Sequence, residues 1–291
     1  MCRTPLSDLN FPAFRQFLMP DNPDLTTAFK FIFLVERFYA GLTPPADAVD
    51  VEFGLGGNLL YAGELDSGAS ALVMAANIAG AASLTATADQ AVQKQAVRDG
   101  VVDFLVNSVD EALRILKNEI RKRQMVAVCV GLAPETVERE MVERGVQPDL
   151  LRPDAPDAPE RTLFLDQGAR TVEFTAPPED LALLTFHVTS APAIWMPKLD
   201  AIAIACLRED PSPDAWAVRR WLLLGARYMG RQAQNVRVVN CSPQSARLFL
   251  ARVQLAVERG EIGVPVWMSF NRGEESLLVH PSPPGVRESA G

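Results

Sequence analysis

In the middle third of the chain, short apolar runs alternate with segments whose apolar residues recur every three to four positions. Continuous or period-two apolar runs are typical of strands, and the longer spacing is typical of amphipathic helices. The predicted strands are 49–53, 81–87, 101–106, 126–130 and 149–152. The predicted helices between them are 66–80, 90–98, 109–122 and 137–144. Ser108 with Glu111 matches a capping box, and Thr136 is the predicted cap of the last of these helices.

This alternation predicts an α/β fold in which a Rossmann-like parallel sheet carries flanking helices. A helix over about 25–40, capped by Asp24, is predicted before it. Additional α/β elements are predicted at the C-terminus, where the pattern is less regular and 197–207 fits either a helix or a strand. The other predicted C-terminal elements are strands at 171–174, 181–187, 236–239 and 264–270, the last being the final strand, and helices at 214–230 and 243–259.

The predicted domain boundaries follow from composition. Residues 1–47 form an N-terminal helical lead-in, and residues 48–152 form the Rossmann-like domain. The proline-rich and acidic connector PDAPDAPE, residues 153–160, separates it from a C-terminal α/β region over 161–280 and a tail over 281–291.

Charge and cysteine content restrict the function classes. The formal net charge is −8, which disfavours duplex nucleic acid and anionic membrane surfaces as partners. The uncharged stretch Ala71–Ala88 is rich in small residues, so it is interpreted as a buried helix and strand rather than as a membrane span. The four cysteines lack metal-ligand spacing, and Cys129 lies within an apolar run. We therefore expect a cytoplasmic protein with no metal site, no nucleic-acid partner and no membrane partner.

The segment Gly54-Leu55-Gly56-Gly57 follows the first predicted strand. Glycines before a helix let the backbone approach a phosphate, and the free N–H groups at the helix start favour an anion. Gly63 and Gly68 lie close behind in the sequence. The pattern predicts a site for a nucleotide or another phosphorylated small molecule, and the alternative is a tight turn without a ligand.

The same segment resembles the central NAD-binding portion of the urocanase (urocanate hydratase) family, over about 100 residues. The resemblance rests on a series of short motifs in the same order. These are Gly54–Gly57, Ser67-Gly68-Ala69, Ile78-Ala79-Gly80, Asp89, Gly100, Asp110–Leu113, Glu143–Val146 and Pro148-Asp149. It implies cofactor-binding positions at Gly54, Gly56, Gly57, Gly68 and Thr87, with NAD as the possible cofactor. An active member would be a lyase that adds water to an imidazole substrate.

Three departures from the family pattern bear on function. Residues 58–66 are an insertion in this comparison. Glu64 and Asp66 within it are expected to be exposed to solvent; pointing inward, they would position a ligand or act as acid/base groups, but they would also repel a pyrophosphate. Thr87 stands where the family has an acidic residue that binds the NAD ribose. Leu150–Asp154 replaces a polar stretch at the active site. The resemblance therefore supports the fold without carrying urocanate hydration over to this chain.

Other polar residues fit structural roles first. His187 lies in an apolar strand-like run, and Asn77 lies in an apolar helix. The basic segment Arg114–Arg123 and the arginines beside Trp216, Trp221 and Tyr228 could bind nucleic acid, but solvated edges of amphipathic helices are the simpler interpretation. Two classes of function stay open: an enzyme or binding protein for a small molecule, and a non-catalytic regulatory or structural homo-oligomeric protein that keeps the fold.

Overall fold

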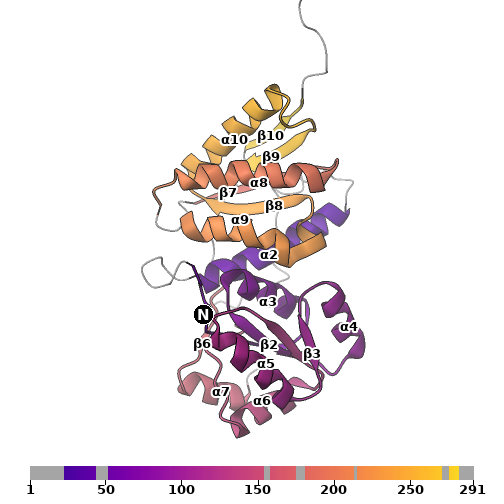
Figure 1. Cartoon of the computed structure of the whole chain (residues 1–291), viewed down its shortest axis with the longest axis vertical. Helices are drawn as coiled ribbons and strands as arrows, with labels where there is room; N and C mark the ends of the chain where they lie inside the picture. The colour runs from indigo at the N-terminus through magenta and orange to yellow at the C-terminus, as the bar shows by residue number, and fades with distance from the viewer. Residues whose placement is uncertain are drawn as a thin grey trace, which may run out of the picture. The chain divides into compact units, whose positions relative to one another are not determined.

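In the computed structural model, residues 23–43, 52–153, 158–174, 181–212, 215–270 and 275–281 are described. The chain forms two compact units (Figure 1). One contains 31–178 and 211–233, and the other contains 1–30, 179–210 and 234–291. The boundary between them falls within the first described helix, α2 (Pro23–Leu42), after Lys30. Each unit has its own β-sheet.

The larger unit is built on a six-stranded sheet with the order β3-β4-β2-β1-β5-β6. Every pairing in this sheet is parallel, which confirms the predicted Rossmann-like fold class. The strands are β1 (Leu59–Glu64), β2 (Ala82–Ala86), β3 (Phe104–Val106), β4 (Ala127–Val130), β5 (Leu150–Leu151) and β6 (Arg170–Thr171).

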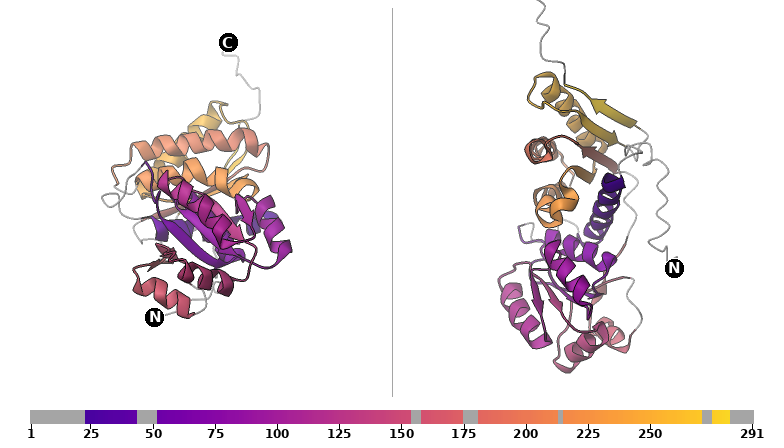
Figure 2. Two further views of the ribbon diagram at one scale, coloured as in Figure 1. Left: turned by 60° about the horizontal axis from the view of Figure 1, so that its bottom comes forward. Right: turned by 90° about the vertical axis from the view of Figure 1, so that its right-hand side faces the viewer.

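Helices connect these strands and cover both faces of the sheet, as two further views show (Figure 2). The connecting helices are α3 (Ser67–Ala79), α4 (Gln90–Arg98), α5 (Val109–Arg121), α6 (Pro134–Glu143) and α7 (Pro159–Asp166). The chain moves from β1 to β2 and β3 in one direction and returns through β4 to β5 and β6 in the other. Because such crossovers are right-handed, α3 and α4 lie on one face and α5, α6 and α7 lie on the other.

Apolar packing holds the α5–α7 face together. Leu84 and Val128 from the sheet meet Leu116, Met141 and other buried residues of the helices. On the opposite face, α3 is almost entirely buried, because it packs on β1 and β2 and is covered by α9 (Ala215–Met229). The uncharged stretch Ala71–Ala88 thus forms α3 and β2, as predicted, and no helix within the described ranges is long and apolar enough to cross a membrane.

The first strand of the sheet is not where the sequence pattern predicted it. Residues 49–51 lie outside the described residues, and Glu52 and Phe53 lie in a turn. Strand β1 is formed instead by Leu59–Glu64, within the segment interpreted as an insertion. A central parallel strand is buried on both faces and has a continuous apolar sequence, here Leu-Leu-Tyr-Ala, rather than an alternating one.

Four smaller predictions are also corrected. Helix α2 begins at Pro23, so Asp24 lies within it. Helix α6 begins at Pro134 after Ala133, because proline is favoured in the first helical turn, and Thr136 lies inside the helix. Strand β3 forms only at Phe104–Val106. Helix α7 begins at Pro159, inside the predicted connector, of which residues 154–157 lie outside the described residues.

The second unit is an antiparallel sheet with the order β10-β9-β7-β8. Its strands are β7 (Ala182–His187), β8 (Val236–Cys241), β9 (Val266–Phe270) and β10 (Glu275–Val279), and its helices α8 (Pro192–Arg208) and α10 (Pro243–Glu258) pack against each other. These elements confirm the additional C-terminal α/β elements. The segment 197–207 is helical, and the strand at 264–270 is not the final one, because β10 pairs with it.

Candidate functional site

The carboxyl edge of the parallel sheet contains a topological switch point between β1 and β5. The chain leaves β1 through α3 toward β2 on one side, and it leaves β5 through α7 toward β6 on the other. Ligands of open α/β sheets bind outside the carboxyl ends of the strands at such a point. The segment after β1, residues 64–68, and the residue after β5, Arg152, therefore form the candidate site.

An ion pair between Asp66 and Arg152 lies at the N-terminus of α3, at the switch point. The Asp66 Oδ1 atom accepts a hydrogen bond from the Ala69 backbone N–H at 2.8 Å, so Asp66 caps the helix. The Arg152 Nη1 atom lies 2.9 Å from the same oxygen and also donates to the Glu64 carbonyl oxygen at 3.3 Å. The Arg152 side chain is 9% exposed and that of Asp66 is 49% exposed. The positive end of the helix is thus already neutralised by a carboxylate of the chain itself.

Arg152 is held in place from two further directions. Arg161, at the start of α7, donates a hydrogen bond to the Arg152 carbonyl oxygen. A side chain at Gly68 would place its first carbon 3.0 Å from the Arg152 guanidinium. The guanidinium therefore occupies the space that the missing side chain of Gly68 leaves open, and this space is not available to a ligand phosphate.

A second polar group lies between the same edge and helix α6. The Tyr61 hydroxyl, from β1, is 3.5 Å from the Pro134 carbonyl oxygen and within hydrogen-bonding reach of the Glu138 carboxylate. Burial raises the pKa of Glu138, and the nearby Glu160 and Glu135 add to the effect. Burial also raises the pKa of Tyr61 well above its usual value. This pair can hold a proton at pH values where an exposed glutamate has lost it.

Thr87 and Asp89 follow β2 at this edge. Thr87 is fully buried, and its hydroxyl oxygen accepts a hydrogen bond from the Asp89 backbone N–H at 3.3 Å. Its carbonyl oxygen accepts from the Gln93 side-chain amide at 2.8 Å. Asp89 caps α4 by accepting from the backbone N–H groups of Ala91 and Val92. Both side chains are thus used within the loop that joins β2 to α4.

The glycine-rich segment lies at the opposite, amino edge of the sheet, because it precedes β1. The Leu55 N–H donates to the Ala79 carbonyl oxygen at 2.8 Å, so the segment packs on the C-terminal end of α3. A first side-chain carbon at Gly54 would lie 2.2 Å from that carbonyl oxygen, and one at Gly56 would lie 2.7 Å from the Arg123 carbonyl oxygen. These glycines accommodate close backbone packing within the domain.

Arg220 of α9 completes the packing around this segment. Its Nε atom donates to the Ile78 carbonyl oxygen at 2.7 Å, and its Nη1 atom donates to the Glu52 carbonyl oxygen at 3.0 Å. The Tyr39 hydroxyl of α2 also binds this helix, donating to the Ala217 carbonyl oxygen at 2.8 Å. Helix α9 is therefore fixed on the parallel-sheet unit by specific hydrogen bonds.

The structure separates the five residues predicted to bind a cofactor. Gly68 and Thr87 lie at the carboxyl edge, after β1 and β2, whereas Gly54, Gly56 and Gly57 lie at the amino edge. The glycines that flank the actual strand-to-helix turn are Gly63, near the end of β1, and Gly68, in the first turn of α3. Gly63 has a φ of +67° with no neighbouring atom near its missing side chain.

Sequence reasoning did not select Arg152, Tyr61 or Glu138. Arg152 was counted as part of an apolar replacement for the family's polar stretch, and Glu138 is one of many exposed-looking acids on an amphipathic helix. The only available signal was position, because Arg152 directly follows the last short strand of the alternating pattern. Its partner Asp66 comes from a segment 86 positions earlier, so the pair needs the fold to form.

His187 and Cys129, for which the sequence predicts structural roles, are both buried. His187 is fully buried, stacks on Trp267 with a centroid distance of 6.0 Å, and has its pKa lowered to about 4 by burial. Cys129 is also buried, and burial raises its pKa. No group of histidine, cysteine and acidic side chains able to hold a metal ion occurs among the residues that the structure describes.

The residues at the switch point do not fit an NAD pyrophosphate. A carboxylate caps the helix where the pyrophosphate would bind, and the guanidinium beside it already pairs with that carboxylate. The glycine-rich segment that could have approached a phosphate is packed against backbone at the other edge.

Comparison with protein families matches residues 51–156 to the urocanase Rossmann-like domain. The match contains β1 to β5 and the helices between them, and it confirms the resemblance inferred from the sequence. Domains of this family are associated with NAD. The central part of this chain is therefore a Rossmann-like domain that is similar to the Rossmann-like domain of the urocanase family.

Proposed function

We propose that this protein is a small-molecule-binding protein that keeps the urocanase-like domain but neither binds NAD at the start of α3 nor hydrates urocanate. The observation that carries the proposal is the Asp66 carboxylate at the N-terminus of α3, paired with the nearly buried Arg152. The match to the urocanase Rossmann-like domain supports the ancestry of the domain.

Electrostatics favours this proposal over a conventional dinucleotide site. A phosphate that replaced water at the start of α3 would lie against a carboxylate, and two like charges 4 Å apart repel by about 4 kcal/mol near a protein surface. The helix dipole and a guanidinium such as that of Arg152 could offset this cost, but both already act on Asp66.

The three buried free thiols, Cys129, Cys206 and Cys241, also fit a protein of the reducing cytoplasm.

The test is NAD binding by isothermal titration calorimetry together with turnover of urocanate, followed by loss of its ultraviolet absorbance. We expect no heat of binding with NAD at millimolar concentration and no turnover. Urocanate turnover, or NAD binding with a micromolar dissociation constant, would contradict the proposal.

A matched variant tests whether the Asp66 carboxylate is the group that prevents phosphate binding at the start of α3. Asp66→Ser keeps a residue that can cap α3 but removes the carboxylate, so the helix should persist. If the carboxylate is what excludes a phosphate, this variant binds inorganic phosphate or NAD more tightly than the natural protein does. Equal and absent binding in both proteins would assign the exclusion to the packed glycine-rich segment instead.

A further inference from the structure

A large groove within the parallel-sheet unit lies at the amino edge of the sheet, away from the switch point. It has a volume of about 1570 Å³, which exceeds the roughly 300–1,000 Å³ of typical small-molecule sites. Its walls are the end of α4, the starts of β3 and β4, part of α5, and the junction of α9 with the short helix η3 (Gly230–Ala233). All of these elements belong to the same compact unit.

Four arginines line this groove, which we call the arginine groove. They come from the four helices α4, α5, α9 and η3: Arg98, Arg114, Arg227 and Arg231. Within the described parts of the chain, none of the four forms an ion pair. The basic residues of α5 and α9, which are far apart in the sequence, thus contribute to one surface in a protein whose net charge is −8.

The acidic side chains of the groove already have partners within the protein. The Asp103 carboxylate accepts a hydrogen bond from the Ala127 backbone N–H at 2.8 Å. Asp99 accepts from the Gln95 side-chain amide at 2.9 Å, and Glu119 pairs with Lys122 at 2.8 Å. Because the partners of Asp103 and Asp99 are neutral, these carboxylates keep their charge, and the four arginines of the groove exceed its three acidic side chains by one charge.

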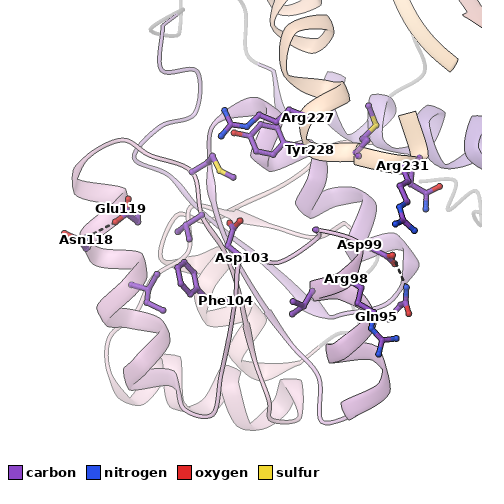
Figure 3. A pocket seen from close by; sticks show the side chains of 18 of the residues that line it. Gln95, Arg98, Asp99, Asp103, Phe104, Asn118, Glu119, Arg227, Tyr228 and Arg231 are labelled. Carbon is purple, nitrogen blue, oxygen red and sulfur yellow. Dashed lines mark hydrogen bonds between the residues drawn. The ribbon is translucent and has the colours of Figure 1, made fainter. Parts of the chain in front are cut away.

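One exposed and one half-buried aromatic ring line the groove together with these cations. Phe104, at the start of β3, is 48% exposed, although a phenylalanine in a strand is ordinarily buried. Tyr228 lies on α9, with the Arg227 guanidinium 5.5 Å from its ring centroid. Figure 3 shows Phe104 and Asp103 between Asn118 and Glu119 on one side and Arg98 and Arg231 on the other. The lining of the groove thus combines an exposed phenylalanine ring, a tyrosine ring and guanidinium groups.

We propose that the arginine groove binds a nucleoside phosphate, with the base on Phe104 or Tyr228 and the phosphates on the arginines. Aromatic side chains stack on any base, and guanidinium groups recognise phosphates with paired hydrogen bonds. This site deepens the proposed function by naming a ligand class for it, and it lies at the opposite edge of the sheet from the position that NAD would take.

The test uses the full chain and a fluorescent N-methylanthraniloyl derivative of ADP, titrated by fluorescence anisotropy. We expect saturable binding that ADP displaces and that added salt weakens. Arg227→Gln with Arg231→Gln should weaken binding by about tenfold or more, because hydrogen bonds to charged groups are lost. Phe104→Ala should weaken it by about fivefold or more through lost stacking.

The control is Lys117→Gln with Arg121→Gln, which removes the same charge from exposed positions of α5 outside the groove. It should change the dissociation constant less than twofold. Equal weakening by both pairs, or no saturable binding, would overturn the site and leave the groove arginines as partners of the helix C-terminal dipoles.

Two further competition measurements distinguish a free nucleotide from single-stranded nucleic acid as the ligand of the groove. Displacement by ADP but not by a single-stranded oligonucleotide of 20 bases supports a free nucleotide, and tighter displacement by the oligonucleotide supports the groove but assigns it to single-stranded nucleic acid. If NAD binds, and Arg152→Ala changes its dissociation constant while the groove variants do not, the proposed function is contradicted but the nucleotide site in the arginine groove is not.

Discussion

The two edges of the parallel sheet differ in how their charged side chains are used. At the carboxyl edge, Asp66 and Arg152 satisfy each other and the start of α3. At the amino edge, four arginines line a large groove without forming ion pairs among the described residues, while the glycine-rich segment beside it is packed on backbone. Charged side chains that pair with each other stabilise the fold, whereas arginines without an ion pair, gathered in a groove with an exposed phenylalanine, mark a surface that can bind a ligand.

The largest expected effect concerns the glycines of the two edges. Gly54→Ala would place a carbon 2.2 Å from the Ala79 carbonyl oxygen in a backbone with a φ of +58°, so we expect a loss of about 3 kcal/mol in the free energy of unfolding. Gly63→Ala, at the carboxyl edge, has a φ of +67° but no neighbouring atom, so about 1 kcal/mol is expected. Urea denaturation measures both, and equal losses would show that the amino-edge segment is not packed.

The next effect tests the ion pair at the carboxyl edge. Arg152→Ala leaves the Asp66 carboxylate without its nearly buried partner and leaves the Glu64 carbonyl oxygen with one donor fewer. Because Asp66 is half-exposed and keeps its helix-capping bond, we expect a loss of about 2 kcal/mol. Arg144→Ala, which removes a more exposed ion pair with Asp110, is the control and should cost clearly less, because solvent screens exposed pairs.

A smaller effect separates the cap from the ion pair. Asp66→Ala removes both the acceptor for the Ala69 N–H and the Arg152 partner, whereas Asp66→Ser retains an acceptor. We expect the serine variant to be about 1 kcal/mol more stable than the alanine variant, the usual value of an N-cap. Identical thermal midpoints for the two variants would mean that Asp66 acts on the fold only through Arg152.

The smallest effect depends on pH. The pKa of Glu138 is raised in the folded protein, so the native state holds a proton that the unfolded chain releases. The contribution of this group to stability is therefore complete below the ordinary glutamate pKa and is lost as the pH rises through the raised value. Glu138→Gln should flatten the stability curve over that interval, as measured by urea denaturation at successive pH values. An unchanged slope would show that the carboxyl of Glu138 is solvated.

Much of the fold was predictable because local patterns and tertiary packing agree. The buried runs of β2 and β4 and the capped helices α4 and α5 formed where periodicity placed them; the Ser108 side chain accepts from the Glu111 N–H as a capping box requires. The first strand was missed because the Gly54–Gly57 motif suggested a preceding strand, while the continuous apolar run at β1 matched an insertion in the family comparison.

The sequence by itself determined the α/β alternation, the parallel sheet and the similarity of the central segment to the urocanase Rossmann-like domain, because these depend on local periodicity and on motif order along the chain. The tertiary structure alone decided which edge of the sheet each polar group occupies. Asp66 meets Arg152, and Arg114 shares a groove with Arg227, only after the strand order has brought distant segments together. A shift of the first strand from 49–53 to 59–64 moved the glycines from one edge of the sheet to the other, since the direction of a strand fixes which of its ends a loop follows.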